Sequence, residues 1–197
     1  MITSNTMNPD RIDSSPGRAP VAVPTLAFMK PRLSRWIALG AGSGLSPVSP
    51  GTVGTLWAWV VFLLLNPLLG SAGWAIVLPL AFVIGVWACE RTGQDLGVSD
   101  HGAMVWDEVV AFWLVLWIVP DSPASQWSAF LLFRFFDIVK PVPIRQLERA
   151  VRGGLGVMLD DLLAAAYTLL LIALWVRVFH LLCSLHSCHD RIRFPDR

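Results

Sequence analysis

The feature that most constrains this chain is a run from residue 36 to residue 89 that contains no Asp, Glu, Lys or Arg. A helix needs about 20 apolar residues to cross the roughly 30 Å hydrocarbon core of a bilayer, so this run is long enough for two crossings. Of the 197 residues, 55% are hydrophobic and only 15% are charged. The sequence therefore predicts an all-α integral membrane protein, because helices satisfy their own backbone hydrogen bonds in lipid.

Five apolar segments are expected to form helices, and together they predict a polytopic membrane helical bundle. Asn66-Pro67 and the stretch from Gly70 to Gly73 break the first long run into a helical hairpin, because Pro cannot donate to the helix ladder. The residues from Pro120 to Pro123 form the turn of a second hairpin. The five segments cover residues 53–69, 72–89, 109–119, 126–136 and 162–179.

Two successive hairpins place three loops on the same face of the membrane: residues 30–52, 90–108 and 137–161. Lys30, Arg32 and Arg35 come just before the first apolar segment. Basic residues are enriched in cytoplasmic loops, so these loops are predicted to be cytoplasmic and to carry the catalytic residues. The side reached by the C-terminal tail is left open, because its arginines conflict with the same rule.

The ends of the chain differ from its middle. Residues 1–30 are rich in Pro and Ser and predict a disordered N-terminal extension, residues 31–180 form the membrane domain, and residues 181–197 form a tail. Fifteen basic and 14 acidic residues give a net charge of +1, which favours no nucleic-acid partner. Three cysteines are too few and too scattered for a disulfide scaffold, and the oligomeric state is left open.

Acidic residues gather at the starts of two apolar segments, where water and ions are still within reach. Clustered carboxylates raise one another's pKa unless a cation lies between them, and such hard oxygen ligands suit Mg²⁺ or Mn²⁺. Asp100 is also expected to cap a helix. If no metal binds, these acids are helix caps and interfacial side chains. The predicted metal ligands are Asp100, Asp107, Glu108, Asp137, Asp160 and Asp161.

Basic side chains beside such a metal predict phosphate binding. Arg134 and Lys140 flank Asp137 on nearly one helical face, and a Gly-rich turn at residues 40–55 offers backbone N–H groups and hydroxyls to an anion. A salt-bridged helix end and a rigid turn are the alternatives for these two stretches. The candidate phosphate ligands are Ser46, Thr52, Arg134, Lys140 and Arg145.

His101 adds a group that could transfer a proton beside Asp100. A hydrogen-bonding role at a helix start is the alternative for this side chain. The predicted catalytic residues are Asp100, His101, Asp107 and Glu108.

Four motifs, in their order along the chain, resemble those of the phosphatidylglycerophosphatase A family over roughly residues 36 to 175. The resemblance implies a bacterial inner-membrane lipid phosphatase, multi-pass and with its site facing the cytoplasm, that uses Mg²⁺ to convert phosphatidylglycerophosphate to phosphatidylglycerol and inorganic phosphate. The motifs are Gly42-Ser-Gly-Leu-Ser-Pro47 with Pro50-Gly-Thr-Val-Gly-Thr-Leu56, Asp95-Leu-Gly-Val-Ser-Asp-His-Gly102 with Val105-Trp-Asp-Glu108, Phe133-Arg-Phe-Phe-Asp-Ile-Val-Lys-Pro-Val-Pro143, and Gly153-Gly-Leu-Gly-Val-Met-Leu-Asp-Asp161.

The residues themselves are consistent with this chemistry. A metal held by some of the six acids would polarise the phosphoryl group and activate water, while Arg134 and Lys140 neutralise charge in the transition state. A carboxylate nucleophile that forms an aspartyl phosphate is an open variant. A cation transporter with interfacial carboxylates is the alternative function, although these acids lie at helix ends.

Overall fold

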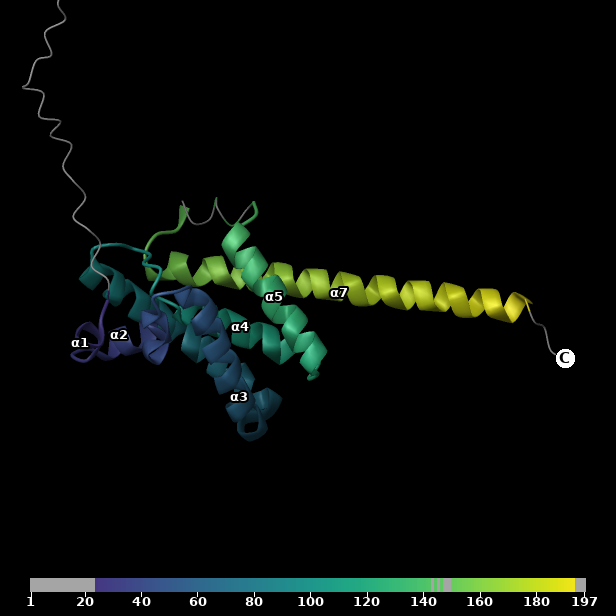
Figure 1. The fold of residues 1–197 in the computed structure, drawn as a ribbon, viewed down its shortest axis with the longest axis horizontal. Coiled ribbons are helices and arrows are strands. Elements are labelled where there is room, and N and C mark those ends of the chain that lie inside the picture. Colours follow the sequence, from purple (N-terminus) through teal and green to yellow (C-terminus); the bar gives the residue numbers. More distant parts are fainter. Residues whose placement is uncertain (1–23, 143, 145, 147–149, 194–197) are drawn as a thin grey trace, which may run out of the picture.

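The computed structural model describes residues 24–142, 144, 146 and 150–193; its regular elements in this part of the chain are all helices, joined by loops and turns, with no strand (Figure 1). This agrees with the predicted all-α class. Residues 1–23 of the predicted extension lie outside the described residues, so its boundary stays a prediction. The elements are α1 (Leu26–Met29), α2 (Leu33–Ala38), the 3-10 helix η1 (Gly40–Leu45), α3 (Pro50–Leu96), α4 (Trp106–Ile118), α5 (Pro123–Val139) and α7 (Gly154–Arg193).

The long element α3 is a helical hairpin. Gly70 has φ 58° and ψ −172°, a conformation open to glycine, and it interrupts the helix. The rings of Phe62 and Trp74 stack with centroids 4.7 Å apart, whereas twelve residues of straight helix would separate them by about 18 Å. The Trp74 indole N–H also donates to Asn66 Oδ1 at 3.1 Å. The predicted hairpin therefore forms, but the chain turns at Gly70, and Pro67 stays inside the helix.

Helices α4 and α5 form a second hairpin around the turn that was predicted at residues 120–123. The Ser122 hydroxyl accepts the backbone N–H of Ser125 at 3.2 Å, and Pro123 occupies the first turn of α5. The Trp117 indole N–H donates to Ser71 Oγ at 3.3 Å. This contact brings the turns of both hairpins to the same end of the molecule, opposite the loop that connects α3 to α4.

Two helices begin where the sequence did not place them. The segment expected at 162–179 is part of α7, which begins at Gly154, because the Gly154 N–H donates to Glu90 Oε2 at 2.7 Å and this acceptor caps the helix from another element. Asp100 was expected to cap a helix, but α4 begins at Trp106, and its N-cap is Val105, which makes no side-chain cap hydrogen bond.

The core lies between α3, α4, α5 and α7 and is rich in aromatic rings. Trp74, Phe112 and Phe133 are fully buried. The indole N–H groups of Trp59 and Trp113 donate to Gln126 Oε1 and the Ala58 carbonyl oxygen, each at 2.8 Å. Several tryptophans thus hold the bundle together while their polar atoms remain satisfied.

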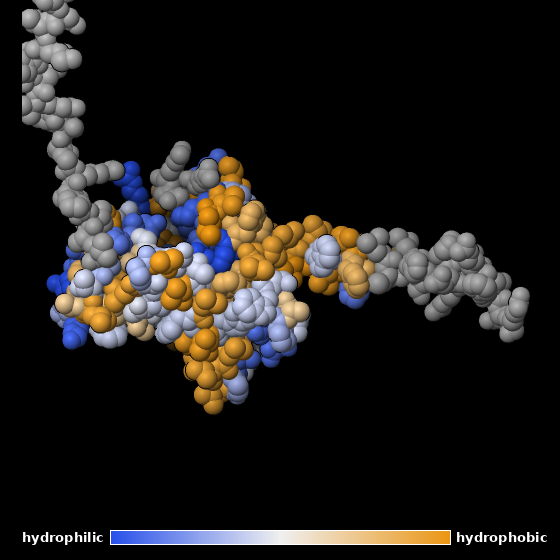
Figure 2. Space-filling model, in the orientation of Figure 1, coloured by the Kyte–Doolittle hydropathy of each residue, from blue (hydrophilic) through white to orange (hydrophobic). Residues whose placement is uncertain are grey.

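The outer surface is strongly apolar along α3 and α7. Leu64, Leu68 and Leu170 are 68%, 79% and 67% exposed, and Figure 2 shows apolar surface around the tip of α3 and along α7. Both helices are long and apolar enough to cross a membrane. An apolar surface of this extent is typical of a protein that associates with a membrane.

Candidate functional site

A small cavity of about 150 Å³ lies at the end of the bundle opposite the two hairpin turns. All six predicted metal ligands line this cavity, together with Lys140. They come from the loop before α4, the first turn of α4, the last turn of α5 and a position about two turns into α7. The acidic residues are Asp100, Asp107, Glu108, Asp137, Asp160 and Asp161.

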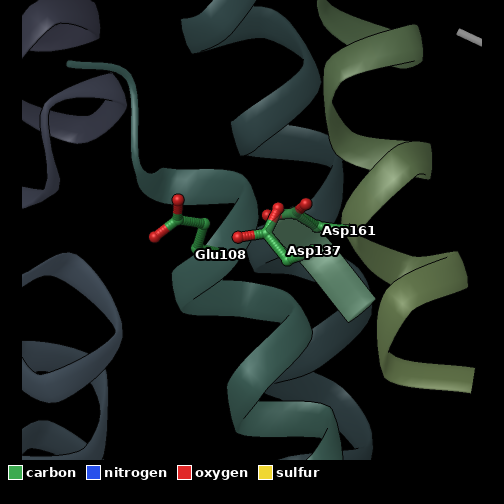
Figure 3. A group of neighbouring side chains, drawn as sticks. All are labelled: Glu108, Asp137 and Asp161. Carbon is green, nitrogen blue, oxygen red and sulfur yellow. The ribbon is translucent and has the colours of Figure 1, made fainter. Parts of the chain in front are cut away.

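Glu108, Asp137 and Asp161 are the carboxylates that meet most closely. One carboxylate oxygen of each lies within 4.8 Å of the corresponding oxygens of the other two. Figure 3 shows the carboxylates of Asp137 and Asp161 side by side, with Glu108 near them on α4. Three separate helices therefore supply oxygen ligands at a spacing suited to one cation.

Glycines on α3 allow the start of α4 to approach this closely. A Cβ at Gly51 would overlap the Glu108 carboxylate, and a Cβ at Gly54 would overlap Val105. The Val105 N–H donates to the Ala38 carbonyl oxygen at 2.9 Å, which ties the same segment to α2. Much of the Gly-rich stretch thus serves as a close-packing surface for residues 105–108.

Arg134 connects the acids of α4 and α5. Its Nη1 lies 3.1 Å from Glu108 Oε2 and 2.7 Å from Asp137 Oδ2, and it also donates to the Thr55 hydroxyl at 3.4 Å. The Thr55 hydroxyl lies 3.2 Å from Glu108 Oε2. These side chains are largely buried, so the geometry of Glu108 is fixed from two sides.

The cavity holds more negative than positive charge. Six carboxylates line it, and among the described residues Arg134 and Lys140 are the cationic side chains that contact them; Lys140 Nζ lies 3.4 Å from Asp160 Oδ2. Among these eight described side chains, negative charges exceed positive ones by four when every group is ionised. Within the described part of the chain, Asp107 Oδ1 and Asp161 Oδ2 are buried without a hydrogen-bond partner. Buried oxygens of this kind fit a bound divalent cation.

Burial and crowding also change the acidity of the two carboxyls at the start of α4, outside the helices long enough to span a membrane. Desolvation raises the pKa of Glu108 to about 7; the Asp137 charge adds to this rise, and Arg134 and Thr55 oppose it. Desolvation, followed by the neighbouring Glu108, raises the pKa of Asp107. A cation in the cavity would favour the ionised form of both groups.

A larger cleft of about 800 Å³ lies beside the acidic cavity, and Asp100, Lys140, Val157 and Asp160 line both spaces. Ile138 and Arg152 line only the larger one. Figure 2 shows hydrophilic surface directly beside apolar surface near the C-terminal end of α5. The acidic cavity therefore communicates with a space in which polar and apolar surfaces meet.

The other predicted site residues lie elsewhere. His101 Nδ1 accepts the Ala103 N–H at 3.1 Å, which is the structural role weighed against proton transfer. Ser46 donates to the Val48 carbonyl oxygen at 2.8 Å and lines a different cavity, near α1. Neither Ser46 nor Thr52 lines the acidic cavity. Arg145 lies outside the described residues.

Thr55 and Arg152 contribute to the site although neither was among the predicted ligands. Thr55 is one of five hydroxyl residues in the Gly-rich stretch, and it lies one helical turn after Gly51, on the face of α3 that meets Glu108. Arg152 belongs to a basic segment with several similar residues. The sequence contains no signal that separates it from the others.

The chain matches known proteins over the region that builds this site. Residues 36–176 match the family described as phosphatidylglycerophosphatase A. A phosphatidylglycerophosphatase A of Haemophilus influenzae is 44% identical over 138 residues, which cover 69% of this chain and 84% of that protein. One from Escherichia coli is 45% identical over 130 residues, which cover 65% and 74% respectively. No solved structure matches the chain at a significant level.

Proposed function

The chain belongs to the phosphatidylglycerophosphatase A family, and we propose that it hydrolyses phosphatidylglycerophosphate to phosphatidylglycerol and inorganic phosphate in the acidic cavity, with Mg²⁺ as its cofactor. The family match spans every residue that meets there, from Thr55 to Asp161. The convergence of carboxylates from three helices on one cavity is the observation that carries the proposal. The comparisons give no support to the alternative of a cation transporter.

Mg²⁺ fits the residues present. Glu108, Asp137 and Asp161 would hold the ion, since their oxygens are mutually close and Asp161 Oδ2 has no other partner among the described residues. Mg²⁺ takes oxygen ligands and keeps some of its waters. When bound, Mg²⁺ would neutralise negative charge on the phosphate and lower the pKa of a water molecule that it holds.

The residues of the chain would then orient and activate the reactants. Arg134 keeps one buried N–H, at Nε, without a partner among the described residues, so its guanidinium can bind one further acceptor such as a phosphate oxygen. Lys140, at the border between cavity and cleft, would neutralise a second phosphate oxygen. Both cations would stabilise the negative charge that spreads over the phosphoryl oxygens in the transition state.

In the proposed hydrolysis, a water oxygen bonds to phosphorus as the bond from phosphorus to the glycerol oxygen breaks. Asp107 would accept the proton of this water, because it lines the cavity and its Oδ1 is buried without a hydrogen-bond partner among the described residues. The departing glycerol oxygen takes a proton and becomes the free hydroxyl of phosphatidylglycerol. A carboxylate nucleophile would instead form an acyl phosphate on the enzyme. Acid quench of a reaction with labelled substrate would trap this intermediate.

We further propose that the protein is a multi-pass protein of the bacterial inner membrane with its site at the cytoplasmic surface. Lys30, Arg32 and Arg35 precede α3, and Arg32 and Arg35 pair with Asp95 near the end of α3. These basic residues belong to the same end of the bundle as the site and favour the cytoplasmic side. The lipid headgroup would then meet the cavity at the membrane surface.

The function is tested by phosphate release from phosphatidylglycerophosphate in detergent micelles. The purified chain should release phosphate with Mg²⁺ and lose activity with excess chelator, and Glu108→Gln should be inactive. Asp121→Asn is a control, because Asp121 pairs with Gln126 in the turn between α4 and α5, far from the cavity. Phosphate release that survives the chelator, or full activity of the Glu108 variant, would contradict the proposed role of the metal.

A further inference from the structure

The larger cleft extends the site away from the reacting phosphate. Asp100, Lys140, Val157 and Asp160 line both the cleft and the acidic cavity, so the two spaces adjoin. A molecule whose terminal phosphate lies among the carboxylates has the rest of its polar headgroup in the cleft. The side chains that line only the cleft are therefore placed to contact that part of the headgroup.

Among the described residues, Arg152 is the cationic side chain that lines the cleft but not the acidic cavity. Lys140, the other cation that lines the cleft within the described part of the chain, has its Nζ 3.4 Å from Asp160 Oδ2. Arg152 is exposed and forms no ion pair with any carboxylate in the described part of the chain. Its planar guanidinium can bind two oxygens of one phosphate group.

An apolar stripe leads to the same cleft along α5. Leu131, Phe135 and Ile138 are spaced four and three residues apart, so they share one helical face, and they are 63%, 56% and 70% exposed. Ile138 also lines the cleft. The acyl chains of a lipid can lie along this stripe while its headgroup enters the cleft.

We propose that Arg152 binds the phosphodiester of the substrate, the phosphate that joins the diacylglycerol to the headgroup, while the terminal phosphate lies in the acidic cavity. This inference rests on the proposed function. Acyl chains on the α5 stripe place the phosphodiester between the stripe and the acidic cavity, in the cleft that Arg152 lines. The enzyme thereby selects lipids with two phosphates joined by a short polar linker over lipids such as phosphatidic acid, which has only a terminal phosphate.

The test compares Arg152→Gln with the wild-type chain in detergent micelles with Mg²⁺. KM for phosphatidylglycerophosphate should rise about tenfold while kcat changes less than about twofold, because the contact contributes equally to the ground state and the transition state. Arg152→Lys should lie between the two. Arg91→Gln is the matched control, since Arg91 is exposed at the end of α3 and lines neither space.

Two inhibitors separate the subsites. Phosphatidylglycerol carries only the phosphodiester, so its inhibition constant should rise about tenfold in Arg152→Gln. Inorganic phosphate occupies only the acidic cavity, so its inhibition constant should stay unchanged. The proposal is overturned if KM changes less than twofold or if both inhibition constants shift equally. A wild-type chain that releases no phosphate from phosphatidylglycerophosphate would instead contradict the proposed function itself.

Discussion

The fold places three carboxylates of like charge close together in the acidic cavity, those of Glu108, Asp137 and Asp161. Their electrostatic repulsion opposes this arrangement. Arg134 offsets part of this repulsion through Glu108 and Asp137. Asp161 is only 3% exposed, and its Oδ2 lacks a hydrogen-bond partner among the described residues. A buried carboxylate without a partner costs stability. Repulsion among these carboxylates therefore destabilises the site, and a bound cation would offset that repulsion.

Asp161→Asn is expected to have opposite effects on stability with and without the cation. In chelator the variant should unfold about 2–4 °C above the wild type, because one buried negative charge is gone. In saturating Mg²⁺ it should unfold below the wild type, and its activity should fall about 100-fold or more. Thermal unfolding in detergent, with and without Mg²⁺, measures both signs. Equal shifts in the two conditions would argue against a metal at Asp161.

At the level of the elements, the contact between α3 and α4 determines where Glu108 lies. A methyl group at Gly51 would overlap the Glu108 carboxylate, so Gly51→Ala should reduce kcat about tenfold or more by displacing this side chain. The shorter side chain of Glu108→Asp should partly relieve the overlap. Activity assays on the two single variants and the double variant measure the coupling, and strictly additive losses would show that the overlap is not the cause.

The position of α7 depends on a cap from α3. Glu90 Oε2 accepts the Gly154 N–H at 2.7 Å, and Glu90 Oε1 accepts Gln94 Nε2 at 2.8 Å. Glu90→Ala should destabilise the protein by about 1 kcal/mol and reduce activity, because α7 carries Asp160 and Asp161. Glu90→Gln keeps an acceptor oxygen and should lose less.

Gln94→Ala is the control for this cap, since it removes the partner of the other Glu90 oxygen and leaves the bond to α7 intact. Thermal unfolding and initial rates of the three variants provide the comparison. A Gln94→Ala variant as impaired as Glu90→Ala would place the effect within α3 and not at the cap.

The start of α7 also shows what local sequence cannot predict. Apolar patterning placed this helix at residue 162, whereas the cap that fixes its start at Gly154 comes from Glu90, which is 64 residues earlier. Both Asn66-Pro67 and the stretch from Gly70 to Gly73 were expected to break the first apolar run; the turn occurs at Gly70, where a positive φ is tolerated, and Pro67 stays within the helix. Patterning located the hairpins correctly because each depends only on neighbouring residues.

For the whole molecule, the two hairpin turns should face one side of the membrane and the N-terminal basic residues the other. In a background that lacks Cys89, Cys183 and Cys188, an impermeant maleimide should label Asp121→Cys and Ser71→Cys on intact cells. Lys30→Cys should react only after the inner membrane is permeabilised. Labelling of Lys30→Cys on intact cells would invert the proposed orientation.

The sequence predicted which acidic residues form the site better than it predicted their contacts. Composition and spacing predicted the six acids that line the cavity. Charged side chains at the same end of several apolar helices avoid lipid by facing the interior of the bundle. Arg134 was expected on phosphate, but it also contacts Glu108, Asp137 and Thr55. Contacts between residues 79 positions apart depend on how the helices pack, which no local pattern records.

The order of these elements along the chain has a consequence for biosynthesis. Asp160 and Asp161 lie in α7, the last described helix, whereas Thr55 and Glu108 lie in α3 and α4. All elements before α7 are synthesised without these two carboxylates, so the nascent chain lacks part of the acidic cavity until α7 has been made. We expect a chain truncated before α7 to show no phosphatase activity.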